Sequence, residues 1–456
     1  MNPLETEIAS IESFQPIQAR GTVSVLRGLT LIVNDLPLPV GSLVRVRCNA
    51  INECRPGEVV GFEEGHALVM LLGSVSGVRP GDDVESVETT PCVRVSHRML
   101  GRVINGLGEP IDGQGPITQT RTVPITPQAV SPLKRRRISR ALPTGVRVID
   151  GLVTVGAGQR MGVFAGPGVG KSTMLGSIAR HTEADISVIA LIGERGREVR
   201  DFLEESLGEE GLARSVVVVA TSDESPLMRI RAFSTACAVA EMFRADSRDV
   251  MLMVDSVTRF AQAQRQIGLA VGEPPATKGY TPSVFAQLPV VLERAGAIEG
   301  GGSITGFYTV LVDGDDMTEP IADAVRGILD GHVILSRDLA RRGHFPAIDV
   351  LDSISRLADT VSTDTHLAAR RRVLRLLASH KEVEDLIQIG AYASGSNPDA
   401  DIAIQMRDAL DTFVQQSPSQ RSPYEDSVNA LTALAIQIGQ LESRAKHQRA
   451  PQPSSA

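Results

Sequence analysis

The residues that follow the apolar run 161–164 have the types and the order of a phosphate-binding loop. They are Ala165, Gly166, Pro167, Gly168, Val169, Gly170, Lys171 and Ser172, with Thr173 next in the chain. Glycines let backbone N–H groups turn inward around an anion, and a helix that starts near Lys171 adds its positive end. Lys171 can reach the terminal phosphates of a nucleotide, and the Ser172 hydroxyl can bind magnesium. The pattern therefore predicts a site for ATP and Mg²⁺ rather than a chance glycine-rich turn.

Two carboxylates follow two further apolar runs. Glu194 comes shortly after the run 186–192, and Asp255 comes directly after the run 250–254. Because ligands of open α/β sheets lie beyond the carboxyl ends of the strands, we expect both side chains to face the phosphate loop. Asp255 would orient magnesium, usually through water, or else would only cap a helix. Glu194 would orient and polarise the attacking water, or else would only pair with a nearby arginine such as Arg195.

Hydrolysis of a nucleotide also calls for a positive charge near the transferred phosphoryl group. Negative charge spreads over its equatorial oxygens, so an arginine held there lowers the barrier, and this arginine often comes from a neighbouring subunit. Arg356, at the end of Ser353-Ile354-Ser355-Arg356, is one candidate, and Arg195 and Arg259 are others. Spacing alone does not choose among them.

The elements that must position these residues form successive patterns along a chain of 456 residues, which is long for one hydrophobic core. Residues 21–90 contain short β-rich runs between tight turns, which predict a small barrel or sandwich. Residues 91–362 hold a connector and then alternating strand-like and helical runs, which predict an α/β core with a mostly parallel sheet. Residues 363–442 are expected to form a separate domain of amphipathic helices, and residues 443–456 a disordered tail.

Residues 1–20 carry one apolar stripe on a short acidic segment. Its members are Leu4, Ile8, Ile11, Phe14 and Ile17, at spacings of three and four. A stripe this short needs something to cover it. We expect it to pack either against its own domain or against a partner.

The composition argues against several classes of protein. A net charge of -8, 3% aromatic residues and no tryptophan disfavour a surface built to hold nucleic acid, so no nucleic-acid partner is expected. No uncharged apolar run approaches membrane-spanning length, and residues 1–20 lack the apolar core and cleavage site of a secretory signal. The cysteines have no close paired spacing, which favours a reducing cytosol over a disulfide or zinc framework. They are Cys48, Cys54, Cys92 and Cys237.

Longer motifs surround the candidate residues. They are Gly193-Glu194-Arg195-Gly196-Arg197-Glu198, the stretch 272–280 (GEPPATKGY), and Pro346-Ala347-Ile348-Asp349 running into Ser353-Ile354-Ser355-Arg356. With them, nearly the whole chain closely resembles the type III secretion ATPases, namely the flagellar export ATPase and its virulence-system relatives, which are similar to the catalytic beta subunit of rotary ATP synthase. The resemblance implies a RecA-like P-loop core with Lys171 in the Walker A motif, Glu194 as catalytic carboxylate, Asp255 as Walker B residue and Arg356 as an arginine that acts in trans.

The same resemblance implies an assembly and a place in the cell. It implies a homohexameric ring with active sites at the subunit interfaces and a coiled-coil stalk protein in the central pore. The first twenty residues would bind a dimeric regulator, and the C-terminal helices would meet chaperones, export substrates or the export gate. The protein would then work in the cytoplasm, at the cytoplasmic face of the inner-membrane export apparatus, with peripheral membrane association.

Two positions depart from the family pattern. Ala165 stands where the strict loop has glycine, and a methyl group at the end of a strand need not touch phosphate. Phe345 stands before Pro346 where the family commonly has tyrosine. A phenyl ring still stacks on adenine, so we expect binding to survive without the hydroxyl contact, unless Phe345 is only a core residue.

The resemblance favours an ATP hydrolase that energises or primes flagellar protein export, with other readings left open. A virulence type III system would use the same motifs. An RNA-translocating ring ATPase has a similar architecture, but the acidity, the few aromatic residues and the stretch 272–280 count against it. A non-catalytic ring subunit would typically lack Glu194, and a rotary synthase subunit would carry an acidic lever motif that is absent near 390–398.

Overall fold

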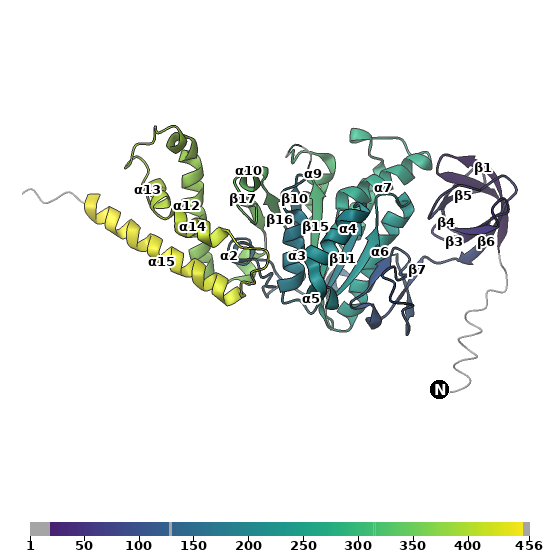
Figure 1. Cartoon of the computed structure of the whole chain (residues 1–456), viewed down its shortest axis with the longest axis horizontal. Helices are drawn as coiled ribbons and strands as arrows, with labels where there is room; N and C mark the ends of the chain where they lie inside the picture. Colours follow the sequence, from purple (N-terminus) through teal and green to yellow (C-terminus); the bar gives the residue numbers. More distant parts are fainter. Residues whose placement is uncertain (1–18, 127–129, 313, 315, 450–456) are drawn as a thin grey trace, which may run out of the picture.

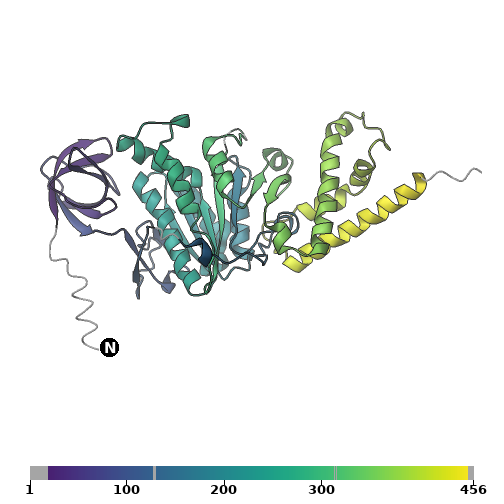
Figure 2. The ribbon, with the colours of Figure 1, turned by 180° about the vertical axis from the view of Figure 1, so that it is seen from behind.

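The computed structural model describes residues 19–126, 130–312, 314 and 316–449, and three parts follow one another along its long axis (Figure 1). A β-barrel lies at one end, a large sheet between helices lies in the middle, and a group of helices lies at the other end. The view from behind shows the same succession (Figure 2). The predicted fold class, a small barrel followed by a mostly parallel α/β core and C-terminal helices, is confirmed. The apolar stripe predicted within residues 1–20 lies outside the described residues.

The N-terminal part is a closed barrel with the strand order β1-β2-β5-β4-β3-β6. Its strands are β1 (Arg20–Arg27), β2 (Thr30–Asn34), β3 (Leu43–Cys48), β4 (Glu53–Glu63), β5 (His66–Leu71) and β6 (Asp83–Glu88). Strand β3 shows the alternation expected of a barrel strand with one face toward the interior. Val44, Val46 and Cys48 are buried, while Arg45 and Arg47 are exposed. Closure pairs every strand on both sides and leaves no open edge.

The connector after the barrel is more ordered than the sequence indicated. Strands β7 (Cys92–Val95) and β9 (Arg121–Pro124) pair with each other in antiparallel fashion. Strand β8 (Val103–Asn105) joins the edge of the central sheet beside β12 (Ser215–Ala220). The short run Val103 to Asn105 is not distinctive in sequence, and its pairing with β12 is what makes it a strand.

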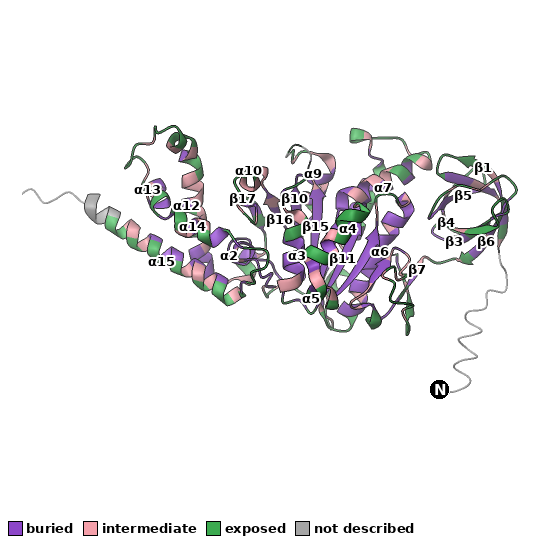
Figure 3. Cartoon of the chain, in the orientation of Figure 1, coloured by how far each residue is buried: buried purple, intermediate pink, exposed green. Residues whose placement is uncertain are grey.

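The central sheet has the order β17-β16-β10-β15-β13-β11-β12-β8. Its remaining strands are β10 (Arg160–Ala165), β11 (Ile186–Ile192), β13 (Asp249–Asp255), β15 (Ser303–Leu311), β16 (Gly331–Leu335) and β17 (Ile348–Ser355), and β14 (Gly296–Ala297) pairs with β15 off this path. All pairs along the order are parallel except β16 with β17. The middle strands are buried on both faces, which explains their nearly continuous apolar sequences (Figure 3).

Helices cover both faces of this sheet. One face packs against α6 (Pro226–Ala245), α7 (Val257–Ala270), α8 (Pro282–Leu292) and α9 (Pro320–Ile328), and the other against α2 (Arg147–Leu152) and α3 (Lys171–His181). Strand β11 shows the division, because Val188 and Ala190 belong to the first core while Ile189 and Leu191 belong to the second. Shorter helices complete the part: α4 (Gly196–Asp201), a π-helical turn (Phe202–Leu207), α5 (Gly208–Ala213), α10 (Arg337–Arg341) and α11 (Ala358–Val361).

The C-terminal helices are α12 (Asp364–Gln388), α13 (Pro398–Gln405), α14 (Arg407–Val414) and α15 (Tyr424–Arg449). They pack against the second core of the sheet, because Leu376, Phe413 and Leu431 belong to one apolar cluster with residues of α2 and α3. No helix of the described residues is long and apolar enough to cross a bilayer.

The prediction of a disordered tail over 443–456 is wrong as far as Arg449, where α15 ends. Residues 440–449 contain strong helix formers such as Leu441, Glu442 and Arg444 and no glycine or proline, so the helix continues through them. The first proline of the tail is Pro451, and residues 450–456 lie outside the described part of the chain.

Candidate active site

The phosphate loop joins the end of β10 to the start of α3. Its glycines adopt the backbone conformations that the sequence pattern requires, since φ is +78° at Gly168 and +89° at Gly170. Gly170 is the residue before α3, and no side chain caps the first turn of this helix. Apart from its two chain neighbours, no described residue has an atom within 4 Å of the place where a Cβ of Gly168 would stand. The loop therefore presents free backbone amides to an open space at the positive end of a helix, which suits an anion.

Three of the four charged residues predicted for the site lie together at this loop. The Lys171 ammonium donates a hydrogen bond of 2.6 Å to Asp255 Oδ1 and lies 3.7 Å from Glu194 Oε1. Strand β15 lies between β10 and β13, and the Thr309 hydroxyl donates to the same Asp255 oxygen at 2.7 Å. Thr309 was not found from sequence, although a polar residue within a buried strand is a signal that could have indicated it.

Electrostatics in this cluster raise the pKa values of both Lys171 and Glu194. Burial disfavours the ammonium, but the carboxylates of Asp255 and Glu194 outweigh it and raise the pKa of Lys171. Burial, reinforced by the Asp255 carboxylate, raises the pKa of Glu194 to about 7, although Lys171 acts in the opposite direction. Glu194 Oε1 is buried without a hydrogen-bond partner among the described residues. A carboxylate in this condition can bind a water molecule and titrates near neutral pH.

Neither alternative for the two carboxylates matches their surroundings. The residue that caps α7 is Ser256, whose hydroxyl accepts from the Arg259 backbone N–H, so Asp255 is left for Lys171 and Thr309. Arg195 pairs with Glu198, and Arg197 pairs with Asp201. Glu194 lies instead against Lys171. Arg259 also belongs to this neighbourhood, because its stem packs 2.8 Å from where a Cβ of Gly193 would stand.

A cavity of about 290 Å³ opens beside the loop. Its lining is mostly apolar and includes Val169, Gly170, Thr173, Met174, Phe345 and Pro346. The Phe345 ring lies at the mouth with 42% of the residue exposed, so it is not a core phenylalanine. The lining also includes Gln416, Ser417 and Pro418, from the C-terminal part of the chain. Sequence reasoning missed these three, since they belong to no motif and lie far along the chain from the loop.

Arg356 lies away from this cluster in its own chain. Strand β17 is antiparallel to β16, and it ends at Ser355 opposite Gly331, the first residue of β16. The loop follows Ala165, which lies beside Leu335, the last residue of the same strand. Arg356 is therefore exposed at the end of the strands that lies away from the phosphate loop. The structure does not bring it together with Lys171, Glu194 and Asp255 within one chain.

The fold and the loop define a P-loop ATPase with a RecA-like core. The family model described as "ATP synthase alpha/beta family, nucleotide-binding domain" matches residues 145–355, the beta-barrel domain of that family matches residues 27–88, and the "T3SS EscN ATPase C-terminal domain" matches residues 362–433. The chain belongs to the family of flagellum-specific ATP synthases and type 3 secretion system ATPases, and it is an ATPase.

Individual relatives carry both names. The flagellum-specific ATP synthase of Bacillus subtilis (strain 168) is 54% identical over 383 residues, 83% of this chain and 86% of the relative. The type 3 secretion system ATPase of Xanthomonas euvesicatoria is 50% identical over 414 residues, 91% of this chain and 93% of the relative. Among solved structures, the assembled ATPase EscN in complex with its central stalk EscO, from enteropathogenic E. coli, is similar with a TM-score of 0.84 and 41% identity, covering 91% of this chain and 100% of that one.

Proposed function

We propose that this chain hydrolyses ATP to energise or prime protein export through a flagellar type III apparatus. The proposal rests on the separation of the catalytic groups, which lie at opposite ends of the strands of one sheet. Lys171, Glu194 and Asp255 lie together at the phosphate loop, while Arg356 is exposed at the opposite end of the strands. A site built in this way is complete only when a second subunit supplies the arginine.

The residues of the loop divide the work of binding and reaction. Backbone N–H groups between Gly166 and Thr173, apart from Pro167, which has none, would surround the phosphates, and Lys171 would neutralise the terminal ones. The exposed Ser172 hydroxyl and the Asp255 carboxylate fit a magnesium ion there, held directly by the first and through water by the second. Mg²⁺ would supply charge neutralisation between the terminal phosphates.

Glu194 would orient the attacking water and accept its proton. Its Oε1 atom, which has no hydrogen-bond partner among the described residues, and its pKa of about 7 suit a base that works near neutral pH. Phe345 would stack on the adenine in the cavity beside Gly170. Arg356 of a neighbouring subunit would stabilise the charge that develops on the transferred phosphoryl group.

The assembly that follows from this division is a homohexameric ring. The related EscN was solved as an assembled ATPase in complex with its central stalk EscO, and that precedent supports a ring with a coiled-coil stalk partner for this chain. A dimeric regulator at residues 1–20, an export gate, chaperones and export substrates complete the proposed set of partners. The ring would work in the cytoplasm at the inner-membrane export apparatus.

A virulence type III system is the second candidate for the apparatus. The flagellar relative from Bacillus subtilis is 54% identical, and the secretion relative from Xanthomonas euvesicatoria is 50% identical, which favours flagellar use by a small margin. Deletion of the gene distinguishes the two, because loss of swimming with intact secretion of virulence proteins would support flagellar use.

The first experiment measures ATPase activity against protein concentration, with molecular size measured alongside and RNA added in a parallel series. We expect the specific activity to rise steeply as rings form and to be indifferent to RNA. Full activity in the monomer would contradict a site built at subunit interfaces. Activity that needs RNA would instead support an RNA-translocating ring.

A further inference from the structure

Two contacts hold the backbone of Arg356 where it follows the end of β17. Its N–H group donates to the carbonyl oxygen of Asp330 at 3.0 Å. Ser355, the residue before it, pairs with Gly331, where a Cβ would stand only 2.5 Å from a backbone oxygen of β17. The ends of β16 and β17 are therefore packed tightly together, while Arg356 itself is exposed.

The side-chain amide of Gln159 joins the two attachments of Arg356. Gln159 is fully buried, and its Nε2 donates to the Asp330 carbonyl oxygen at 3.1 Å and to Ser355 Oγ at 3.0 Å. Its Oε1 accepts a hydrogen bond of 2.8 Å from the Gly156 backbone N–H. Ser355 Oγ in turn donates to the Thr154 carbonyl oxygen at 2.7 Å. One buried amide thus fixes both the residue before Arg356 and the carbonyl that binds Arg356.

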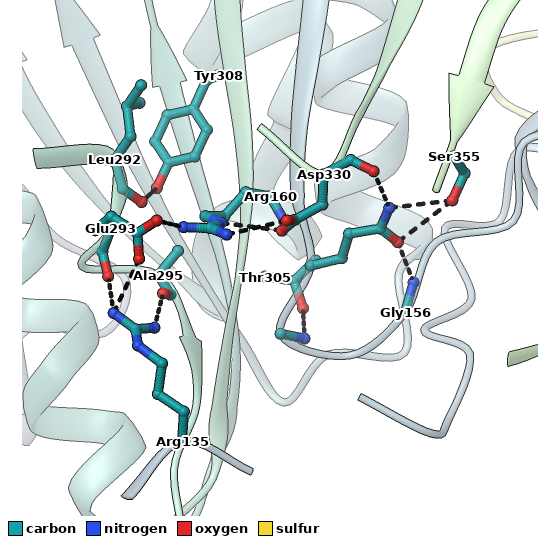
Figure 4. Close-up of polar contacts among 12 residues, drawn as sticks. Arg135, Gly156, Arg160, Leu292, Glu293, Ala295, Thr305, Tyr308, Asp330 and Ser355 are labelled. Carbon is teal, nitrogen blue, oxygen red and sulfur yellow. Dashed lines mark hydrogen bonds and ion pairs between the residues drawn. The ribbon is translucent and has the colours of Figure 1, made fainter. Parts of the chain in front are cut away.

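The neighbouring Arg160 fixes Asp330 itself. Its Nε and Nη2 atoms donate hydrogen bonds of 2.9 Å to Asp330 Oδ2 and Oδ1, respectively. This bidentate pair fixes the orientation of the Asp330 carboxylate as well as its distance from Arg160. Figure 4 shows the Arg160 guanidinium between Asp330 on one side and Glu293 on the other, and Arg160 also hydrogen-bonds the Glu293 carboxylate. Arg135 Nη2 donates a hydrogen bond of 2.6 Å to the backbone carbonyl oxygen of Glu293, which lies above Arg135 in Figure 4. The network therefore joins side chains from five separate segments of the chain: Arg135, Gln159 with Arg160, Glu293, Asp330 and Ser355.

We propose that Gln159, Arg160 and Asp330 are positioning residues for Arg356. They hold its backbone so that the guanidinium is presented to the nucleotide site of a neighbouring subunit. The inference rests on the trans role of Arg356 given under the proposed function. An arginine stabilises a transition state only where its donors meet the developing charge, and a misplacement of about 1 Å can cost on the order of 100-fold in rate.

The location of this network separates it from the nucleotide site of its own subunit. Arg160 is the first residue of β10, and the phosphate loop follows Ala165 at the other end of the strand, roughly 17 Å away at the rise of a β-strand. A change in the network should therefore spare binding of ATP by the subunit that carries it. It should instead slow turnover at the site that receives the arginine.

The test is a set of double-mutant cycles with Arg356, measured on assembled rings. Ser355→Ala removes one contact of Gln159, and Asp330→Asn removes the ion pair with Arg160. We expect the first to lower kcat roughly 3- to 10-fold and the second more, each with KM for ATP changed by less than about twofold. In the Arg356→Ala background neither change should lower kcat further. Ser353→Ala is the matched control, because Ser353 lies on the same strand but bonds Ile334 and Asp349 instead.

Ring size and melting temperature are measured for every variant, and Asp330→Asn is also mixed with Glu194→Gln subunits, whose arginine is intact. We expect the mixture to regain turnover that neither variant has alone. Equal losses of kcat with and without Arg356, a raised KM, or no recovery in the mixture would overturn the positioning role while leaving the trans arginine intact. Wild-type turnover of Arg356→Ala would overturn the trans role and the positioning role together.

Discussion

Lys171 and Asp255 form a partly buried ion pair of 2.6 Å that joins the first residue of α3 to the last residue of β13. Glu194 stands 3.7 Å from the same ammonium, so one lysine is shared by two carboxylates. A nucleotide phosphate that enters the loop competes with both carboxylates for this charge. The two carboxylates therefore hold the Lys171 ammonium at the phosphate loop, where the terminal phosphates would bind.

Asp255→Asn should weaken the use of magnesium. The amide keeps the shape and an acceptor for Thr309 but loses the charge, so we expect the Mg²⁺ concentration for half-maximal turnover to rise about tenfold. The measurement is a magnesium titration of ATPase activity at fixed ATP. Asp316→Asn removes an exposed carboxylate near Lys278 and serves as the control. An unchanged titration curve for Asp255→Asn would exclude the metal role.

Glu194→Gln should bind ATP and fail to hydrolyse it. The amide preserves the shape of the side chain but cannot accept a proton, so turnover should fall about 100-fold or more. Binding of a fluorescent ATP analogue and steady-state hydrolysis are measured on the same preparation. Glu204→Gln, a change on the exposed π-helical turn, is the control. Normal hydrolysis by Glu194→Gln would mean that another group is the base.

The ligand-free protein should lose stability as pH rises through the range in which Glu194 ionises. Its pKa is raised from 4.5 to about 7 in the folded protein, so the folded state binds more protons than the unfolded state between these values. The free energy of unfolding should therefore fall from about pH 5 to pH 7 and level off above. Urea unfolding at several pH values measures this, and Glu194→Gln should show a smaller fall over the same range. Equal falls in both proteins would contradict the raised pKa.

Phe345→Ala should weaken ATP binding, whereas Phe345→Tyr should not. Loss of an aromatic platform costs on the order of 1–3 kcal/mol for a stacked base, so KM should rise about tenfold or more. The measurement is the KM for ATP. Phe62→Ala is the matched control, since Phe62 is exposed to a similar degree on the barrel. An unchanged KM for Phe345→Ala would place the adenine elsewhere.

Arg356→Ala should lose turnover on its own and regain part of it beside Glu194→Gln subunits. In mixed rings an intact nucleotide site of the first variant can meet an intact arginine of the second. Random mixing at equal amounts gives this pairing at about a quarter of the interfaces, which sets the upper limit of recovery. Activity is measured after mixing and reassembly across a range of ratios. No recovery at any ratio would contradict action in trans.

The short strands of the N-terminal part, the parallel core and the loop could be predicted from the sequence, because each rests on a local pattern, whereas the choice between a barrel and a sandwich came from the strand pairing. Alternating residues predict strands such as β3, apolar runs predict buried strands such as β11, and the glycines before Lys171 predict a turn with positive φ. Glu194 and Asp255 were also found from sequence, because they follow predicted strands whose ends must meet at one edge of a sheet.

Contacts between distant segments could not be predicted from the sequence and are seen only in the folded chain. Thr309 reaches Asp255 only because β15 lies between β10 and β13, and Gln416 reaches the cavity only because the C-terminal helices share a core with α2 and α3. The hydrogen bond between Gln159 and Ser355 likewise joins two residues that are 196 positions apart in the sequence. Such contacts have no period or spacing in the sequence, because they are fixed by the order in which strands pair and by which helix faces pack together.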